Sequence, residues 1–209
     1  MTARGSDGRD VREVFVAAGE AFVAVAASLD PARLDDAATE AWTLRELVAH
    51  ATRGLSTVEV TVAAPLGAAS RELESATAYF AAAMAAPHVH EGITQRARDA
   101  AAAVGDDPGG YARAALDRVV PLVETTALDR VVQHVAGRLR FGDYLATRVV
   151  ELTLHTADVQ AATGRPVAFP EAASALTRDV VLGLVGRADP LAVACALTGR
   201  AGPRCNVLA

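Results

Sequence analysis

The chain contains no lysine, because all 20 of its basic residues are arginine. This absence excludes a catalytic lysine, a Schiff base and the lysine of a phosphate-binding P-loop. Aromatic residues make up only 4% of the chain, so it lacks the stacking platforms with which single-stranded nucleic-acid modules hold bases. The formal net charge of −5 also argues against a nucleic-acid partner, since phosphate binding requires a basic surface.

Cysteine and long apolar runs are also scarce. Cys195 and Cys205 are the two cysteines, and they form neither a CxxC motif nor a disulfide framework. The sequence has no apolar region typical of a signal peptide and no uninterrupted apolar run of membrane length. We therefore expect a soluble, cytoplasmic protein. Its 209 residues, 52% of them apolar, suffice for one large domain or one domain with a small appendage.

Apolar residues recur at helical spacing along most of the chain. Thr43, with Glu46 three residues later, forms a capping box, and Trp42 with Leu47 has the arrangement of a hydrophobic staple. Asp143 is expected to cap a long helix that ends before Gly164. The expected helices are at about 10–29, 43–63, 69–85, 92–104, 111–126 with a kink at Pro121, 143–163 and 170–187, with a short one opening at Asp189-Pro190.

The pattern predicts an all-α protein. Residues 127–142 form a connector with a partly alternating pattern, but the sequence shows no convincing pair of strands. Four of the helices are long enough to form a bundle. We expect a disordered tail over residues 1–9, a helical bundle over 10–165 and a helical extension over 166–209.

The expected helix 143–163 has two opposite polar faces. The face assigned to solvent carries Thr153, Thr156 and Gln160. The opposite face, where a core stripe would be apolar, carries Arg148, Glu151, His155 and Asp158. A buried charge is costly unless it is paired or binds a metal, so this second face needs a partner.

Glu151 and His155 are four residues apart, the spacing at which one helix offers two ligands to one metal ion. A carboxylate and an imidazole suit zinc or a similar divalent ion, and a catalytic zinc site usually takes a third protein ligand. His50 is the best candidate, because it lies about two turns into the capped helix and Gly54 leaves room beside it. The alternatives are an exposed polar pair or a hydrogen-bonded core pair, with His50 as a partly buried histidine. The other candidate histidines are His88 and His90, expected in an exposed loop, and His134, in the connector.

Two segments together carry a resemblance. Trp42-Thr-Leu-Arg-Glu-Leu-Val-Ala-His50 and Arg148-Val-Val-Glu151-Leu-Thr-Leu-His155-Thr-Ala-Asp158 resemble motifs of the DinB-like superfamily, and within it of the mycothiol-dependent maleylpyruvate isomerase family. The resemblance covers roughly residues 10–165. It implies a four-helix bundle with a crossover connection. It also implies one divalent metal, most often zinc, on His50, Glu151 and His155, with mycothiol as cosubstrate. Arg148 and Asp158 flank these ligands and are expected to orient them.

The C-terminal part departs from the family pattern. The characterised type of isomerase carries a further α/β domain, whereas about 45 residues follow Gly164 here and indicate two helices and a short tail. The expected activity is therefore that of a thiol S-transferase, or of an isomerase or lyase acting on a small electrophile that the sequence does not name. The alternatives are a helical protein in which the metal is only structural and, less favoured by the acidic composition, an all-α transcription regulator. The oligomeric state, monomer or homodimer, is left open.

Overall fold

The computed structural model describes residues 10–67, 71–85 and 89–200, with only the backbone described at residues 89 and 90. The expected tail at 1–9 and Cys205 lie outside this part of the chain. The helices are α1 (Val11–Ala27), α2 (Leu44–Ala63), α3 (Ala76–Met84), α4 (Val89–Ala101), α5 (Pro108–Thr125), α6 (Phe141–Thr163), α7 (Glu171–Val185) and α8 (Pro190–Leu197). Short 3-10 turns cover Pro31–Arg33 and Ala102–Val104, and the strands are β1 (Val131–His134) and β2 (Gly137–Arg140).

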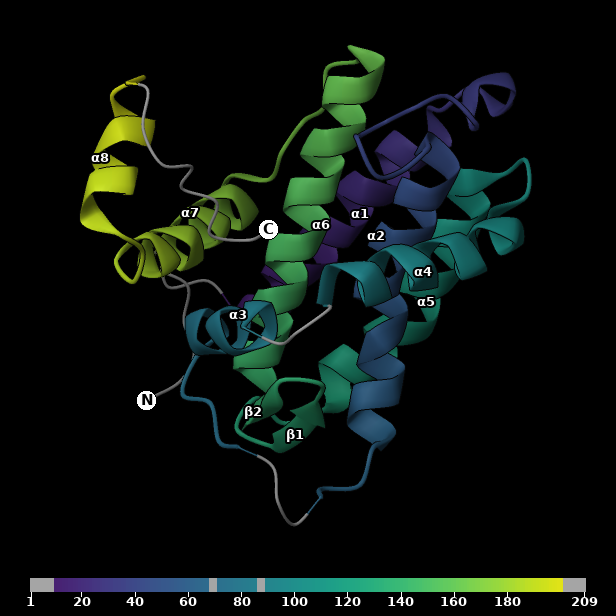
Figure 1. The fold of residues 1–209 in the computed structure, drawn as a ribbon. Helices are drawn as coiled ribbons and strands as arrows, with labels where there is room; N and C mark the ends of the chain where they lie inside the picture. The colour runs from purple at the N-terminus through teal and green to yellow at the C-terminus, as the bar shows by residue number, and fades with distance from the viewer. Residues whose placement is uncertain (1–9, 68–70, 86–88, 201–209) are drawn as a thin grey trace.

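Four long helices form the bundle that the sequence predicts. Helices α1 and α2 each pack against both α5 and α6 (Figure 1). The connection from α2 to α5 crosses over and contains α3, which packs on α6 and α7, and α4, which packs on α2. The bundle interior is apolar, with Phe15, Phe22, Leu47, Leu116 and Leu152 fully buried. This arrangement confirms an all-α bundle with a crossover.

Helix α2, which carries His50, begins where the sequence predicts. The Thr43 hydroxyl accepts from the Glu46 backbone N–H, and the Glu46 carboxylate accepts from the Thr43 N–H at 2.9 Å. These two bonds satisfy helix-end donors that would otherwise be orphaned. The Asp189-Pro190 start of α8 is also confirmed, because the Asp189 side chain accepts from the Ala192 N–H at 2.8 Å. At the other end of α6, Gly164 forms the expected left-handed C-cap with a φ of 68°.

The expectation of no strand pair is wrong. β1 and β2 form an antiparallel hairpin in which Val131 pairs with Arg140 and His134 with Gly137. The turn depends on glycine: Gly137 has a φ of 147°, and a Cβ there would lie 2.4 Å from the Arg71 carbonyl oxygen. Backbone hydrogen bonds between Arg138 and residues Arg71 and Leu73 draw the preceding segment alongside β2. For that reason α3 begins at Ala76 rather than near residue 69.

Asp143 does not cap α6, contrary to the prediction. The helix begins at Phe141, and its N-cap residue, Arg140, makes no side-chain capping bond. Backbone carbonyls replace the side-chain cap, since the Phe141 N–H donates to the Arg130 oxygen and the Gly142 N–H to the Leu128 oxygen. The segment that leads into the hairpin therefore accepts hydrogen bonds from the first backbone N–H groups of α6. Two other helices also differ from their predicted bounds. α5 starts at Pro108, capped by Asp107, rather than near residue 111, and α4 spans Val89–Ala101 rather than about 92–104.

Two further helices follow the bundle. α7 packs against α6, α3 and α1, and its buried residues join the same apolar core. α8 lies at the periphery beside α7 (Figure 1) and leaves Leu191 and Leu197 exposed. Among the helices that the structure describes, none combines the length and apolarity that a membrane span needs.

Candidate metal centre

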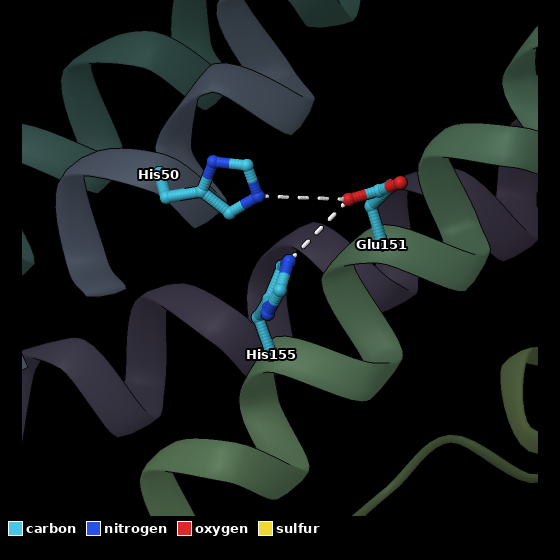
Figure 2. Close-up of side chains that lie close together, drawn as sticks. All are labelled: His50, Glu151 and His155. Carbon is cyan, nitrogen blue, oxygen red and sulfur yellow. Dashed lines mark ion pairs between the residues drawn. The ribbon is translucent and has the colours of Figure 1, made fainter. Parts of the chain in front are cut away.

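Three side chains from two helices of the bundle converge. His50 comes from α2, whereas Glu151 and His155 come from successive turns of α6 (Figure 2). One ligand atom from each residue lies within 4.8 Å of the other two. The structure thus brings together the three residues that the sequence selects as ligands.

Both imidazole rings present the same nitrogen to the carboxylate. Glu151 Oε2 lies 3.3 Å from His155 Nε2 and 3.9 Å from His50 Nε2. The side chains are mostly withdrawn from solvent, with exposed fractions of 14–15% for the histidines and 26% for Glu151. Two imidazoles and one carboxylate are a donor set that zinc and similar divalent ions accept.

His155 is supported by a charged hydrogen bond. Its Nδ1 lies 2.9 Å from Asp158 Oδ2, which leaves Nε2 directed at the cluster. Burial alone would lower the pKa of His155, but hydrogen bonds with Asp158 and Glu151 outweigh it and raise the pKa to about 9. A carboxylate on the far nitrogen is the usual outer partner of a metal-binding histidine. Asp158 therefore contacts the ring of His155 directly.

His50 is supported by an aromatic ring instead. The Trp42 indole stacks on the His50 imidazole with ring centroids 4.5 Å apart, and meets His155 edge-on at 5.9 Å. Within the described residues, His50 Nδ1 is buried without a hydrogen-bond partner. Burial, reinforced by the charge on His155, lowers the pKa of His50 to about 3, so this ring is neutral at physiological pH. Trp42, expected only to pack the start of the helix, contacts both histidines.

Glu151 is ionised at any physiological pH. Burial alone would raise the pKa of its carboxyl, but the hydrogen bond with His155 and the charge of Arg148 outweigh it and lower the pKa to about 2. Without a metal, the cluster therefore contains a carboxylate, an imidazolium and a neutral imidazole. A divalent ion would replace the His155 proton and find all three donors within reach.

A cavity of about 240 Å³ adjoins the cluster. His50, Gly54 and Glu151 form part of its wall. The further wall comes from several elements, with Arg53 on α2, Tyr79 and Phe80 on α3, Arg96 on α4, His134 on β1 and Arg148 on α6. The cluster therefore borders a space large enough for a small molecule.

Sequence reasoning named His134 as a candidate ligand but missed its partner Tyr79 and its place in the cavity wall. His134 was placed in a connector without a partner, but the hairpin carries it into the cavity wall, where its Nδ1 lies 2.6 Å from the Tyr79 hydroxyl. Its ring also packs against Tyr144 at 5.3 Å. Burial, followed by the charge of Arg148, lowers the pKa of His134 to about 4. The alternating pattern of residues 127–142 was the available signal for the hairpin. His88 and the side chain of His90 lie outside the described residues.

The predicted orientation of α6 is wrong in one respect. Thr153 and Thr156, assigned to solvent, are 9% and 1% exposed, and the Glu151 face borders the cavity instead. The Thr156 hydroxyl donates to the Leu152 carbonyl one turn back, at 2.7 Å, so threonine presents an apolar surface to the core. Arg148 and Asp158 form no ion pair with each other, since Asp158 binds His155 and Arg148 faces Tyr79 and Tyr144.

The comparisons with known proteins agree with this geometry. Residues 8–160 match the family model of the mycothiol maleylpyruvate isomerase N-terminal domain. No curated protein and no solved structure matches the chain. The match spans α1 to α6 almost completely and includes His50, Glu151 and His155. The chain therefore belongs to the mycothiol maleylpyruvate isomerase N-terminal domain family.

Proposed function

We propose that His50, Glu151 and His155 bind one divalent cation, with zinc the best candidate. We propose further that the protein uses it with a thiol of the mycothiol type to act on a small electrophile. The family relationship supports a mycothiol-related, isomerase-like activity. The finer assignments, of the metal, the thiol and the reaction, are proposals that rest on the chemistry of the cluster.

One observation carries the proposal. Three donor atoms meet within 4.8 Å of one another, and the described residues contribute no fourth histidine, cysteine or acidic group to this cluster. Two of the three ligands also line the adjoining cavity. A catalytic zinc site typically has three protein ligands and one position for water or substrate, whereas a structural site is closed by four. The arrangement therefore favours a site that accepts an exogenous ligand.

The protein's own residues hold and orient the ligands. Asp158 fixes the ring of His155, Trp42 fixes the ring of His50, and burial keeps His50 unprotonated. A zinc ion bound there would supply a positive charge that favours the thiolate form of a thiol at neutral pH. The partly apolar cavity would exclude bulk water from the electrophile.

Two reactions fit this site. In S-transfer, the thiolate sulfur bonds to an electrophilic carbon and the thioether is the product. With an activated alkene the π bond breaks and the neighbouring carbon takes up a proton, whereas with an alkyl electrophile the leaving group departs with its bonding electrons. In cis–trans isomerisation, the sulfur adds to an activated alkene, the former double bond rotates, and elimination returns the thiol. Both reactions begin with attack of the thiolate sulfur on an electrophilic carbon, so the same residues would serve both.

The proposal is tested by metal analysis and thiol binding on the same preparation. We expect one zinc per chain and binding of mycothiol only to the zinc-loaded protein, measured by calorimetry and by the spectrum of the cobalt-substituted protein. Turnover with a panel of activated alkenes and alkyl electrophiles, including maleylpyruvate, should cease with a chelator and return with zinc. Product analysis then separates a thioether from an isomerised substrate. Zinc binding without any thiol binding would favour a purely structural metal.

A further inference from the structure

Helix α8 is apolar on every side, yet the rest of the described chain leaves it largely uncovered. Its residues are proline, leucine, alanine, valine and cysteine, and none carries a charge. Only Ala192 among them is buried, and no other helix or strand of the described chain packs extensively against α8 (Figure 1). A helix that is apolar all round normally lies in a protein interior. The exposure of α8 therefore indicates a contact that one chain does not supply.

Local interactions alone do not stabilise α8. The Asp189 side chain caps its first turn by accepting from the Ala192 N–H, and Pro190 occupies the first helical position. A helix of eight residues is nonetheless marginal in water without packing of an apolar face. The preceding helix α7 has such packing, because Leu176 and Val180 join the apolar core of the bundle. α8 has only the cap and one buried alanine.

The exposed side of α8 has a symmetric pattern. Leu191, Ala194 and Leu197 follow one another at intervals of three residues, so they lie on one side of the helix. Leu191 is 65% exposed and Leu197 is 78% exposed. The small side chain of Ala194 lets a second helix approach closely between the two leucines. Turning the helix end for end about Ala194 exchanges the leucines, so this α8 face is complementary to itself in an antiparallel pair.

The charges that flank α8 favour the same orientation. No charged residue lies between Asp189 and Arg200, and both of these residues are exposed. Two copies of α8 in parallel would place like charges together. In an antiparallel pair, Asp189 of one copy lies at the end where the other copy carries Arg200. The uncharged face also lets two chains, each with a net charge of −5, meet without like charges in the contact.

We propose that a second copy of this chain covers the α8 face, in a two-fold dimer whose α8 helices run antiparallel and meet at Ala194. Leu191 of each copy then packs against Leu197 of the other. The inference goes beyond the proposed function, because these residues belong to neither the cavity lining nor the cluster of candidate ligands. α8 is only about 12 Å long, so the contact is smaller than a standard interface of about 1,600 Å², and we expect a dissociation constant in the micromolar range.

Sedimentation velocity between about 1 and about 200 µM protein tests the dimer. We expect the wild-type protein to change from monomer to dimer over this range. Leu197→Glu should raise the dissociation constant by at least about tenfold, because the dimer loses two buried leucines and places two carboxylates in an apolar contact. Val60→Glu is the matched control, since Val60 is 68% exposed, lies on α2 and receives the same charge. Circular dichroism and zinc content establish that each variant is folded.

Disulfide trapping tests the orientation. The background carries Cys195→Ser and Cys205→Ser, so that the introduced cysteine is the only one. The Ala194→Cys variant should form a disulfide between two chains under mild oxidation, because position 194 lies on the two-fold axis. The Leu191→Cys variant should cross-link little with itself, because its two copies lie about 9 Å apart along the helix. A mixture of Leu191→Cys and Leu197→Cys chains should cross-link readily, because these positions face each other.

Three results would overturn the inference. A wild-type monomer at every concentration would leave α8 to a different protein or to another segment of the same chain. A dimer that Leu197→Glu and Val60→Glu affect equally would place the interface on another face. A dimer that Ala194→Cys does not trap would contradict the antiparallel arrangement. None of these measurements involves thiol or turnover, so each outcome stays separate from the test of the proposed function.

Discussion

The two halves of the candidate metal cluster are held by different forces. On α6, His155 is fixed by a 2.9 Å contact with the Asp158 carboxylate, and its pKa is raised to about 9. On α2, His50 is fixed by stacking on Trp42, its Nδ1 has no partner among the described residues, and its pKa is lowered to about 3. His155 therefore has electrostatic support and holds a proton, whereas the His50 ring is held in its neutral form. Two imidazoles in one site can thus have opposite acid–base behaviour.

Removing a ligand from the α6 half should have the largest effect. We expect His155→Ala or Glu151→Ala to weaken zinc binding by more than about a hundredfold, because two remaining donors chelate poorly. The bundle should stay folded, since its core is apolar and independent of the metal. Competition with a chromophoric chelator measures the affinity. Gln160→Ala on the same helix is the control, and full zinc occupancy in His155→Ala would refute the assignment.

The pH dependence of zinc binding should identify which half holds the proton. In the metal-free protein His155 is protonated below a pKa of about 9, whereas His50 and Glu151, with pKa values of about 3 and 2, are already deprotonated at neutral pH. Zinc must displace one proton from His155, so apparent affinity should rise about tenfold per pH unit between roughly pH 6 and 8. Calorimetry in buffers of different ionisation enthalpy should count about one released proton. Release of none, or of two, would contradict this description.

Asp158→Asn should test whether this carboxylate causes the difference in acid–base behaviour between His155 and His50. Removing the carboxylate should weaken zinc binding by about tenfold to a hundredfold at pH 8, the usual cost of losing an outer partner of a metal ligand. The loss should be smaller at pH 6, because the substitution also lowers the pKa of His155 and so reduces competition from the proton. A flatter pH profile is therefore the specific signature. An unchanged affinity and an unchanged slope would show that Asp158 does not support the ligand.

Changing the α2 support should have the smallest effect. Trp42→Leu removes the stacked ring, and an aromatic contact of this kind contributes about 0.5–1.5 kcal/mol. We expect a loss in zinc affinity of about threefold to tenfold with an unchanged pH slope, because His50 does not hold the displaced proton. Zinc competition assays at two pH values provide the measurement. A steeper slope in Trp42→Leu would contradict the assignment of the proton to His155.

The sequence predicted the parts of the site that depend on local rules. The capping box of Thr43 and Glu46 sets the start of α2, and the four-residue spacing of Glu151 and His155 places both on one side of α6. Spacing alone could not say which face of α6 meets solvent. Helix α6 is packed against α1, α2, α3 and α7, which bury the face that carries Thr153 and Thr156. This face tolerates burial because the Thr156 hydroxyl forms its hydrogen bond within its own helix.

Contacts between distant segments were beyond sequence reasoning. His134 reaches the cavity because Arg71 and Leu73 pair with the hairpin at Arg138, more than sixty residues away. No local pattern signals that pairing. Asp143 had the identity of a good N-cap, but carbonyls from the approach to the hairpin already satisfy the first donors of α6. The candidate ligands were thus predictable, whereas most of the wall around them was not.

The hairpin turn has a consequence for how the cavity of this protein can be changed. The proposed ligands belong to α2 and α6, whose positions are fixed by the bundle core, whereas His134 at the end of β1 and Val135 in the turn after it line the cavity from the hairpin. Val135 is 84% exposed, so its replacement costs little packing. Changes in the length or residues of this turn can therefore reshape the pocket while the proposed ligands stay in place. The proposed ligands and this part of the cavity wall therefore lie on separate segments of the chain, so one can be changed without replacing the other.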